Sequence, residues 1–298
     1  MVNRDAFSSF HPAVNFLYFV AVIGGAMLLG HPVCLSLSLV CGICYSVYLS
    51  GRRAVRLQLV YMLSMFVFAA LLNPAFSHEG VTILTYLPSG NPLTLESIAY
   101  GASAAATIVT AISWFACYSA VMTSDKFVYL FGRIIPALSL VLSMTLRFVP
   151  KFMAQLKAVT SAQRCIGRDA SSGGVLRRAR NGITILSVMV TWALENSIET
   201  ADSMKSRGYG LPGRTAFSIY RFDRRDRYAL AFILICVAAV ASGAAAGQLY
   251  WRYYPSIKGV PAGALPAAVM TAYLALCAMP VTINLLEDRK WRALQSAA

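Results

Sequence analysis

The chain has 298 residues, of which 58% are hydrophobic and only 13% are charged, and its net charge is +14. Soluble globular domains have about 25% charged residues, so this composition excludes an ordinary soluble domain and indicates a membrane protein. Nucleic-acid binding does not explain the basic excess, because no module of basic and aromatic residues accompanies it.

Six apolar runs without a lysine, arginine, aspartate or glutamate follow one another along the chain. A bilayer core of about 30 Å is crossed by roughly 20 apolar residues in an α-helix. We therefore predict an all-α polytopic membrane protein with about six transmembrane helices, embedded in a lipid bilayer. The runs are residues 13–29, 33–50, 57–72, 97–122, 229–248 and 265–285.

The lysines and arginines are distributed unevenly over the loops between these runs. In a six-span arrangement, Arg252 and Lys258 are the only two of the 26 that fall on one side of the membrane. Cytoplasmic loops carry the basic excess, so we expect a protein of the cell membrane with both termini in the cytoplasm. Ser89 is then expected outside and Ser172 inside, where the basic side faces anionic lipid headgroups.

These features divide the chain into three parts. Residues 1–123 hold the first four predicted membrane helices, residues 124–227 form a cytoplasmic segment, and residues 228–298 hold the last two membrane helices. The middle segment carries 17 basic and 7 acidic residues. It also contains an apolar stretch at residues 134–146 that is too short to span, which we expect at the membrane interface or packed within protein.

Two amphipathic helices are predicted in the cytoplasmic segment from apolar residues that recur at intervals of three and four. The second runs from about Ile183 to Arg207. Neither helix is long or apolar enough to span, so their apolar faces must be buried against each other or against another protein. The apolar positions are Val149, Phe152, Met153, Leu156 and Val159 in the first helix, and Ile183, Leu186, Val190, Leu194, Ile198 and Ala201 in the second.

The second helix ends in a basic turn followed by glycine. Arg207 complements the helix dipole, Gly208 or Gly210 can take the left-handed cap, and Pro212 lies beyond. Arg207 can therefore be explained as part of a helix cap. Arginine also offers five donors in a rigid fork suited to carboxylates, so the same residue is suited to contact a soluble partner.

Three stretches of the cytoplasmic segment carry a resemblance to a known family. They are "LRFVPKF" at Leu146–Phe152, "SAQRCIG" at Ser161–Gly167 and "ADSMKSRGYG" at Ala201–Gly210. Through them, and through the order of its spans, the chain resembles the transmembrane T component of energy-coupling-factor importers, also called the CbiQ type. The resemblance runs through most of the chain.

The family's two signature sites are short small-Arg-Gly motifs that end two cytoplasmic coupling helices. By resemblance, the second is present here as Ser206-Arg207-Gly208. The first aligns with Cys165-Ile166-Gly167, where isoleucine stands in place of arginine and basic residues flank the motif. The residues implied in contacts with the ATPase subunits are Arg164, Cys165, Ile166, Gly167, Arg168, Ser206, Arg207 and Gly208.

The resemblance implies a mechanical role with several partners. Two cytoplasmic ABC ATPase subunits would bind the ends of the coupling helices. The apolar faces of these helices would hold one separate substrate-binding membrane subunit, the S component, which ATP-driven movement reorients for uptake of a vitamin or a metal ion. Substrate choice would then lie in a different polypeptide.

No catalytic, cofactor or metal site is predicted. A P-loop of the form GxxxxGK[ST] is absent from the sequence, so ATP hydrolysis is expected in partner subunits and not in this chain. The alternative is a stand-alone secondary transporter or another multi-span permease. Such proteins usually need ionisable or discontinuous sites at the membrane midplane, and the six apolar runs contain no charge. A membrane-embedded enzyme would need convergent polar residues, such as HExxH, which do not occur.

Overall fold

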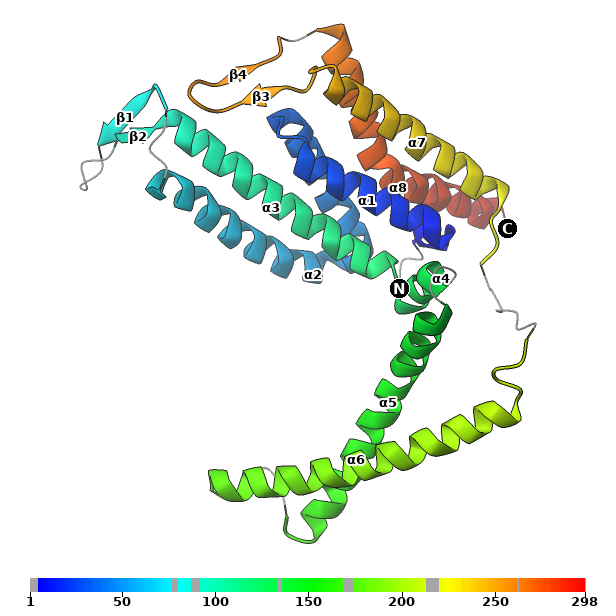
Figure 1. Ribbon diagram of the computed structural model, residues 1–298. Helices are drawn as coiled ribbons and strands as arrows, with labels where there is room; N and C mark the ends of the chain where they lie inside the picture. The colour runs from blue at the N-terminus through cyan, green and yellow to red at the C-terminus, as the bar shows by residue number, and fades with distance from the viewer. Residues whose placement is uncertain are drawn as a thin grey trace. The chain divides into compact units, whose positions relative to one another are not determined.

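The computed structural model consists of helices with two short hairpins (Figure 1), and its chain divides into two compact units. The first unit is Met1–Lys126 with Tyr220–Ala298, and the second is Phe127–Ile219. Ser89 and Ser172, which mark the predicted topology, lie outside the described residues. The structure describes residues 5–76, 80–86, 92–132, 136–168, 174–212, 220–261 and 263–297.

In the first unit, each of the six apolar runs coincides with a helix or with half of one. Four described segments are long and apolar enough to cross a membrane, and two shorter apolar helices accompany them. The prediction of an all-α membrane protein is confirmed. The helices are α1 (Pro12–Leu28), α2 (Pro32–Phe76), α3 (Leu95–Val121), α7 (Arg224–Ala245) and α8 (Ala264–Ala297), preceded by a 3₁₀ turn, η1 (Phe7–Ser9).

Helix α2 contains two of the predicted spans. The break between them is Gly51, whose backbone has φ 71° and ψ 169°. Glycine lacks a Cβ and adopts a positive φ without steric cost, so the chain can change direction at this residue. The apolar segments on either side are Pro32–Gly51 and Leu59–Pro74.

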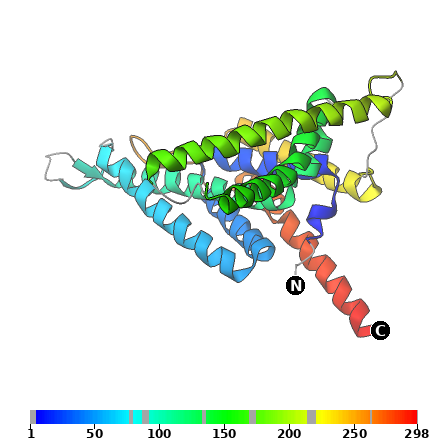
Figure 2. The same cartoon turned by 90° about the horizontal axis from the view of Figure 1, so that it is seen from below.

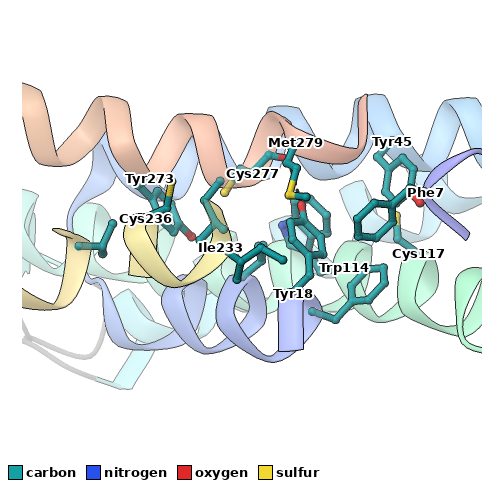
Figure 3. Packing of buried hydrophobic residues seen from close by; sticks show 14 of the residues in the cluster. Phe7, Tyr18, Tyr45, Trp114, Cys117, Ile233, Cys236, Tyr273, Cys277 and Met279 are labelled. Atoms are coloured by element: carbon teal, nitrogen blue, oxygen red, sulfur yellow. Dashed lines mark hydrogen bonds between the residues drawn. The ribbon is translucent and has the colours of Figure 1, made fainter. Parts of the chain in front are cut away.

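The core of the first unit is built by aromatic and sulfur-containing side chains from several helices. Helix α2 packs against α3 and α8, α1 packs against α3 and α7, and α7 packs against α8. Figure 3 shows Phe7, Tyr18, Tyr45 and Trp114 close together, and each is fully buried. The Trp114 indole donates a hydrogen bond to the Ser38 hydroxyl (3.0 Å), so its polar atom is satisfied in the core.

Two short antiparallel hairpins connect helices of the first unit and lie at the same end of it (Figure 1). Strands β1 (Ile83–Tyr86) and β2 (Pro92–Thr94) lie between α2 and α3, and strands β3 (Trp251–Arg252) and β4 (Lys258–Gly259) lie between α7 and α8. Arg252 is the cross-strand neighbour of Lys258. Arg252 and Lys258, the only two basic residues predicted on the side of the membrane opposite the cytoplasm, are therefore adjacent.

The second unit contains two long helices that cross each other (Figures 1 and 2). The described part of the apolar stretch predicted at 134–146, residues 136–146, is not separate from the first amphipathic helix, because one helix continues through Pro150. The second amphipathic helix begins well before Ile183. The elements are α4 (Ser124–Gly132), which continues from the first unit into the second, α5 (Pro136–Cys165) and α6 (Val175–Ser206).

The contact between α2 and α3 depends on a glycine. A Cβ atom at Gly101 would lie 2.7 Å from the backbone oxygen of Ala70 and 3.1 Å from the Asn73 side chain, whereas one at Gly24 would meet nothing within 4 Å. We expect Gly101→Ala to destabilise the protein by roughly 1–3 kcal/mol through overpacking. The measurement is thermal unfolding of the full chain in detergent. Gly24→Ala is the control, and equal melting temperatures for both variants would contradict this packing.

Candidate functional site

The second predicted motif, Ser206–Gly208, lies at the C-terminal end of α6. Arg207 is the C-cap residue, and Gly208 follows with a left-handed φ of 79°. The N–H of Gly208 donates to the C=O of Lys205 (2.9 Å), and the next N–H donates to the C=O of Met204 (3.0 Å). These two bonds define a Schellman motif. The backbone of this turn therefore has the geometry of a helix cap, as predicted for Arg207 and Gly208.

The first predicted motif, Cys165–Gly167, forms the same cap at the end of α5. Gly167 has a left-handed φ of 72°. Its N–H donates to the C=O of Arg164 (3.1 Å), and the next N–H donates to the C=O of Gln163 (2.9 Å). Ile166 thus occupies the C-cap position that Arg207 occupies in α6. The two motifs are equivalent in backbone geometry and differ in side-chain chemistry.

The side chains of both caps face solvent. Ile166 is 63% exposed, and Arg164, Arg168 and Arg207 are exposed as well. Arg164 precedes and Arg168 follows the cap residue of α5, so basic charge surrounds an apolar tip. The caps lie at different ends of the crossed helices (Figure 1). The predicted site residues therefore form two separate clusters.

One aromatic contact marks the crossing of α5 and α6. The rings of Phe152 and Trp192 meet edge to face with centroids 5.2 Å apart. The Lys151 ammonium lies 5.7 Å from the Trp192 ring centroid and donates to the Asn196 side-chain oxygen (2.5 Å). Edge-to-face aromatic pairs contribute about 0.5–1.5 kcal/mol beyond their buried area, so this contact helps to fix the crossing.

The face of α6 that packs inside the chain is not the face predicted from the sequence. Ile185 and Met189 are buried, and with Trp192 they recur at the helical spacing of four and three residues. That spacing was available in the sequence, but the neighbouring stripe contains more large aliphatic residues. The packing face was therefore missed.

Most of the predicted apolar face of each helix is exposed in the described part of the chain, whereas Val159 of the α5 face is half-buried. The exposed fractions lie between 37 and 54% for the other α5 residues and between 50 and 67% for the α6 residues. An exposed apolar surface of this extent, rimmed by charge, is typical of a binding surface. We call these residues the apolar stripes: Val149, Phe152, Met153 and Leu156 on α5, and Ile183, Leu186, Val190, Leu194 and Ile198 on α6.

The first unit contains a cavity of about 450 Å³ between α2, α3 and the β3–β4 hairpin. Among the described residues, its lining is apolar or aromatic apart from Ser36 and Ser103 and includes no charged side chain. Within the described residues, no group of three or more His, Cys, Asp or Glu side chains could hold a metal ion.

Fold and site together define a multi-pass helical membrane protein that carries a pair of crossed, amphipathic helices in addition to its apolar bundle. Residues 11–217 match the family described as cobalt transport protein, CbiQ. The match covers more than half of the chain, which belongs to this family.

Curated relatives are named energy-coupling factor transporter transmembrane protein EcfT. The chain is 35% identical over 101 residues to the protein of Lactobacillus helveticus, 31% over 104 residues to that of Leuconostoc gelidum, and 34% over 99 residues to that of Lacticaseibacillus paracasei. The matched segments span 33–35% of this chain and 36–39% of the relatives' own length.

The cap of α6 requires glycine at position 208. A residue with a Cβ in the left-handed conformation costs about 1–2 kcal/mol, and a Cβ at Gly208 would also lie 3.2 Å from Leu211. We expect Gly208→Ala to fray the last turn and to speed amide hydrogen exchange at residues 203–206 in the full chain. Gly182→Ala is the control, because Gly182 lies inside α6 and a Cβ there would meet nothing within 4 Å. Unchanged exchange in Gly208→Ala would contradict the importance of this cap.

Proposed function

We propose that this protein is the transmembrane coupling subunit of an energy-coupling-factor importer. It transmits ATP-driven movement from two cytoplasmic ABC ATPase subunits to one separate substrate-binding membrane subunit, which takes up a vitamin or a metal ion. Membership of the CbiQ family supports this role, as do the names of the curated relatives. The chain itself is non-catalytic in this proposal, and its sequence contains no P-loop.

The observation that carries the proposal is the combination of two equivalent caps with two exposed apolar stripes. The caps present Ile166 and Arg207 at the tips of rigid helices, where a soluble partner can reach them. The apolar stripes run along the same helices and need a partner that removes them from water. Two kinds of surface on one helix pair suit two kinds of partner.

The chemistry of each surface supports the partner that the family resemblance implies for it. An arginine at a helix end suits an acidic groove on a soluble protein, because its planar fork forms bidentate bonds with carboxylates. We therefore assign the caps to the ATPase subunits and the apolar stripes to the substrate-binding membrane subunit. The basic side chains of Arg164 and Arg168 are the candidates for the charge that Ile166 does not supply.

The proposal includes the orientation of the chain in the membrane. Residues 1–123 and 228–298 hold the membrane helices, residues 124–227 form the cytoplasmic coupling segment, and both termini are cytoplasmic. The support is the distribution of the lysines and arginines, since all but Arg252 and Lys258 fall on one side.

The orientation can be tested with single cysteines placed in a chain whose native cysteines have been replaced. Lys258→Cys lies on the exposed strand β4, and Ser197→Cys lies on the exposed surface of α6. We expect an impermeant thiol reagent to label position 258 in intact cells and position 197 only after the membrane is opened. Labelling of position 197 in intact cells would overturn the six-span arrangement.

The role of Arg207 can be tested by truncation. We expect Arg207→Ala to weaken binding of the ATPase subunits by about 2 kcal/mol, or about 30-fold in Kd, because a buried interface arginine loses its charged hydrogen bonds. Arg207→Lys should restore only part of the affinity, since lysine lacks the planar fork. The measurement is the affinity of the purified chain in detergent for its co-expressed ATPase subunits.

Arg177→Ala is the matched control, because Arg177 is an exposed arginine near the opposite end of α6. Arg164→Ala and Arg168→Ala test which neighbour supplies charge at the first cap, and Ile166→Ala tests its apolar tip. If Arg207→Ala binds the ATPase subunits as tightly as the control, the residue serves only as a helix cap. Substrate uptake by the chain alone, driven by an ion gradient, would instead support a stand-alone secondary transporter.

A further inference from the structure

The segment Asp5–His11 is inserted into one end of the helix bundle of the first unit. Its 3₁₀ turn places Phe7, which is fully buried, against aromatic rings of α1 and α2 (Figure 3). The Phe7 ring meets Tyr18 at a centroid distance of 5.0 Å and Tyr45 at 6.3 Å, both edge to face. The segment is therefore part of the core.

Polar contacts tie the same segment to α2 and α8. The Asp5 carboxylate accepts hydrogen bonds from the Tyr45 hydroxyl (2.9 Å) and from the Asn284 side-chain amide (2.6 Å). The N–H of Ala6 donates in return to the Asn284 side-chain oxygen (2.8 Å). The segment is thus hydrogen-bonded directly to one residue of α2 and one of α8.

Lys126, at the first connection to the second unit, is hydrogen-bonded to this segment. Lys126 is the last residue of the first unit before the chain continues into the second, and it is only 6% exposed. Its ammonium donates to the Ser8 backbone oxygen (2.6 Å), to the Ser8 hydroxyl (2.9 Å) and to the Val121 backbone oxygen (2.9 Å). Burial lowers the pKa of Lys126 and the nearby Asp5 opposes this shift. The three oxygen acceptors therefore compensate a desolvated cation.

Arg225 and Asp226, which follow the second connection, are hydrogen-bonded to the same segment. The chain returns to the first unit at Tyr220. The Arg225 guanidinium then donates to the Ser9 hydroxyl (3.0 Å) and lies 4.7 Å from the Phe10 ring centroid. The backbone N–H of His11 donates to the Asp226 carboxylate (3.0 Å). The first unit thus holds the chain next to both covalent links by hydrogen bonds to one short stretch, residues 5–11.

We propose that Asp5–His11 is a clasp that joins both connections of the coupling segment to α2 and α8, with Lys126 and Arg225 as its positioning residues. The inference rests on the proposed function, because it names the route by which movement of the second unit reaches the membrane helices. Without the clasp, a movement of the second unit would bend the chain at residues 122–123 and 220–223, and the membrane helices would not move with it.

The clasp makes a prediction that needs no partner protein. In the isolated chain in lipid nanodiscs, Lys126→Met should speed amide hydrogen exchange in residues 5–11, where the Lys126 ammonium donates to Ser8. It should also speed exchange in residues 220–226, because the clasp connects that stretch to residues 5–11. The expected increase is about tenfold or more, the factor that corresponds to loss of a hydrogen bond from a charged group. A rise confined to residues 121–126 would overturn the clasp, because the two connections would then be independent.

Matched variants separate this effect from general destabilisation. Lys258→Met removes an exposed lysine of the same unit and should leave exchange in both regions unchanged. Ser8→Ala removes only one of the three acceptors of Lys126 and should give a smaller effect of the same pattern if Lys126→Met does not fold. Lys126→Arg keeps a buried cation with donors and should recover part of the protection.

The second arm tests transmission in the assembled complex with the ATPase subunits. ATP with vanadate should change exchange around Tyr45 and Asn284 in the natural sequence, and Lys126→Met should lose that change while it still binds the ATPase subunits and supports hydrolysis. A retained change in Lys126→Met would overturn the clasp. If the natural sequence binds no ATPase subunit, the proposed function fails, whereas the exchange pattern of the isolated chain still decides whether the clasp exists.

Discussion

A bilayer core contains no water that could bond backbone N–H and C=O groups, so every segment that crosses it must satisfy those groups internally. This constraint assigns the six apolar runs to helices and gathers the polar remainder of the chain in the second unit. It also explains where irregular backbone occurs. Gly51, the two hairpins and the η1 turn lie between helices or at their ends.

A different constraint applies to the second unit. Its helices are too polar to enter lipid, and their apolar faces are too large to remain exposed to water. The contact between α5 and α6 includes Phe152 of the α5 stripe against Trp192, and the apolar stripe of α6 stays exposed. Internal packing therefore does not compensate for the exposed area. Under the proposed function, partner subunits cover these stripes, so binding would add to the stability of this unit.

Long, uniform patterns in the sequence were sufficient to predict the membrane helices and the cap that ends α6. Gly208 and Gly210, the two glycines named for that cap, both have a positive φ. Features that depend on distant pairs were not predictable. Nothing local in the sequence joins Asp5 to Asn284, and strands β3 and β4 are too short to show an alternating pattern. The packing face of α6 was missed because two apolar stripes compete on one helix and the larger one serves no internal contact.

The equivalence of the two caps separates two tasks that one motif performs. Glycine in the left-handed conformation ends the helix and directs the chain away, and this task is the same in α5 and α6. The C-cap side chain then projects from this backbone, so isoleucine and arginine occupy matching positions in the same pattern of capping hydrogen bonds. Under the proposed function, the ends of α5 and α6 offer their partners the same shape with different chemistry. The contact at Arg207 depends on charge and is weakened by salt, whereas the contact at Ile166 depends on apolar burial, with Arg164 and Arg168 as the charges that flank it.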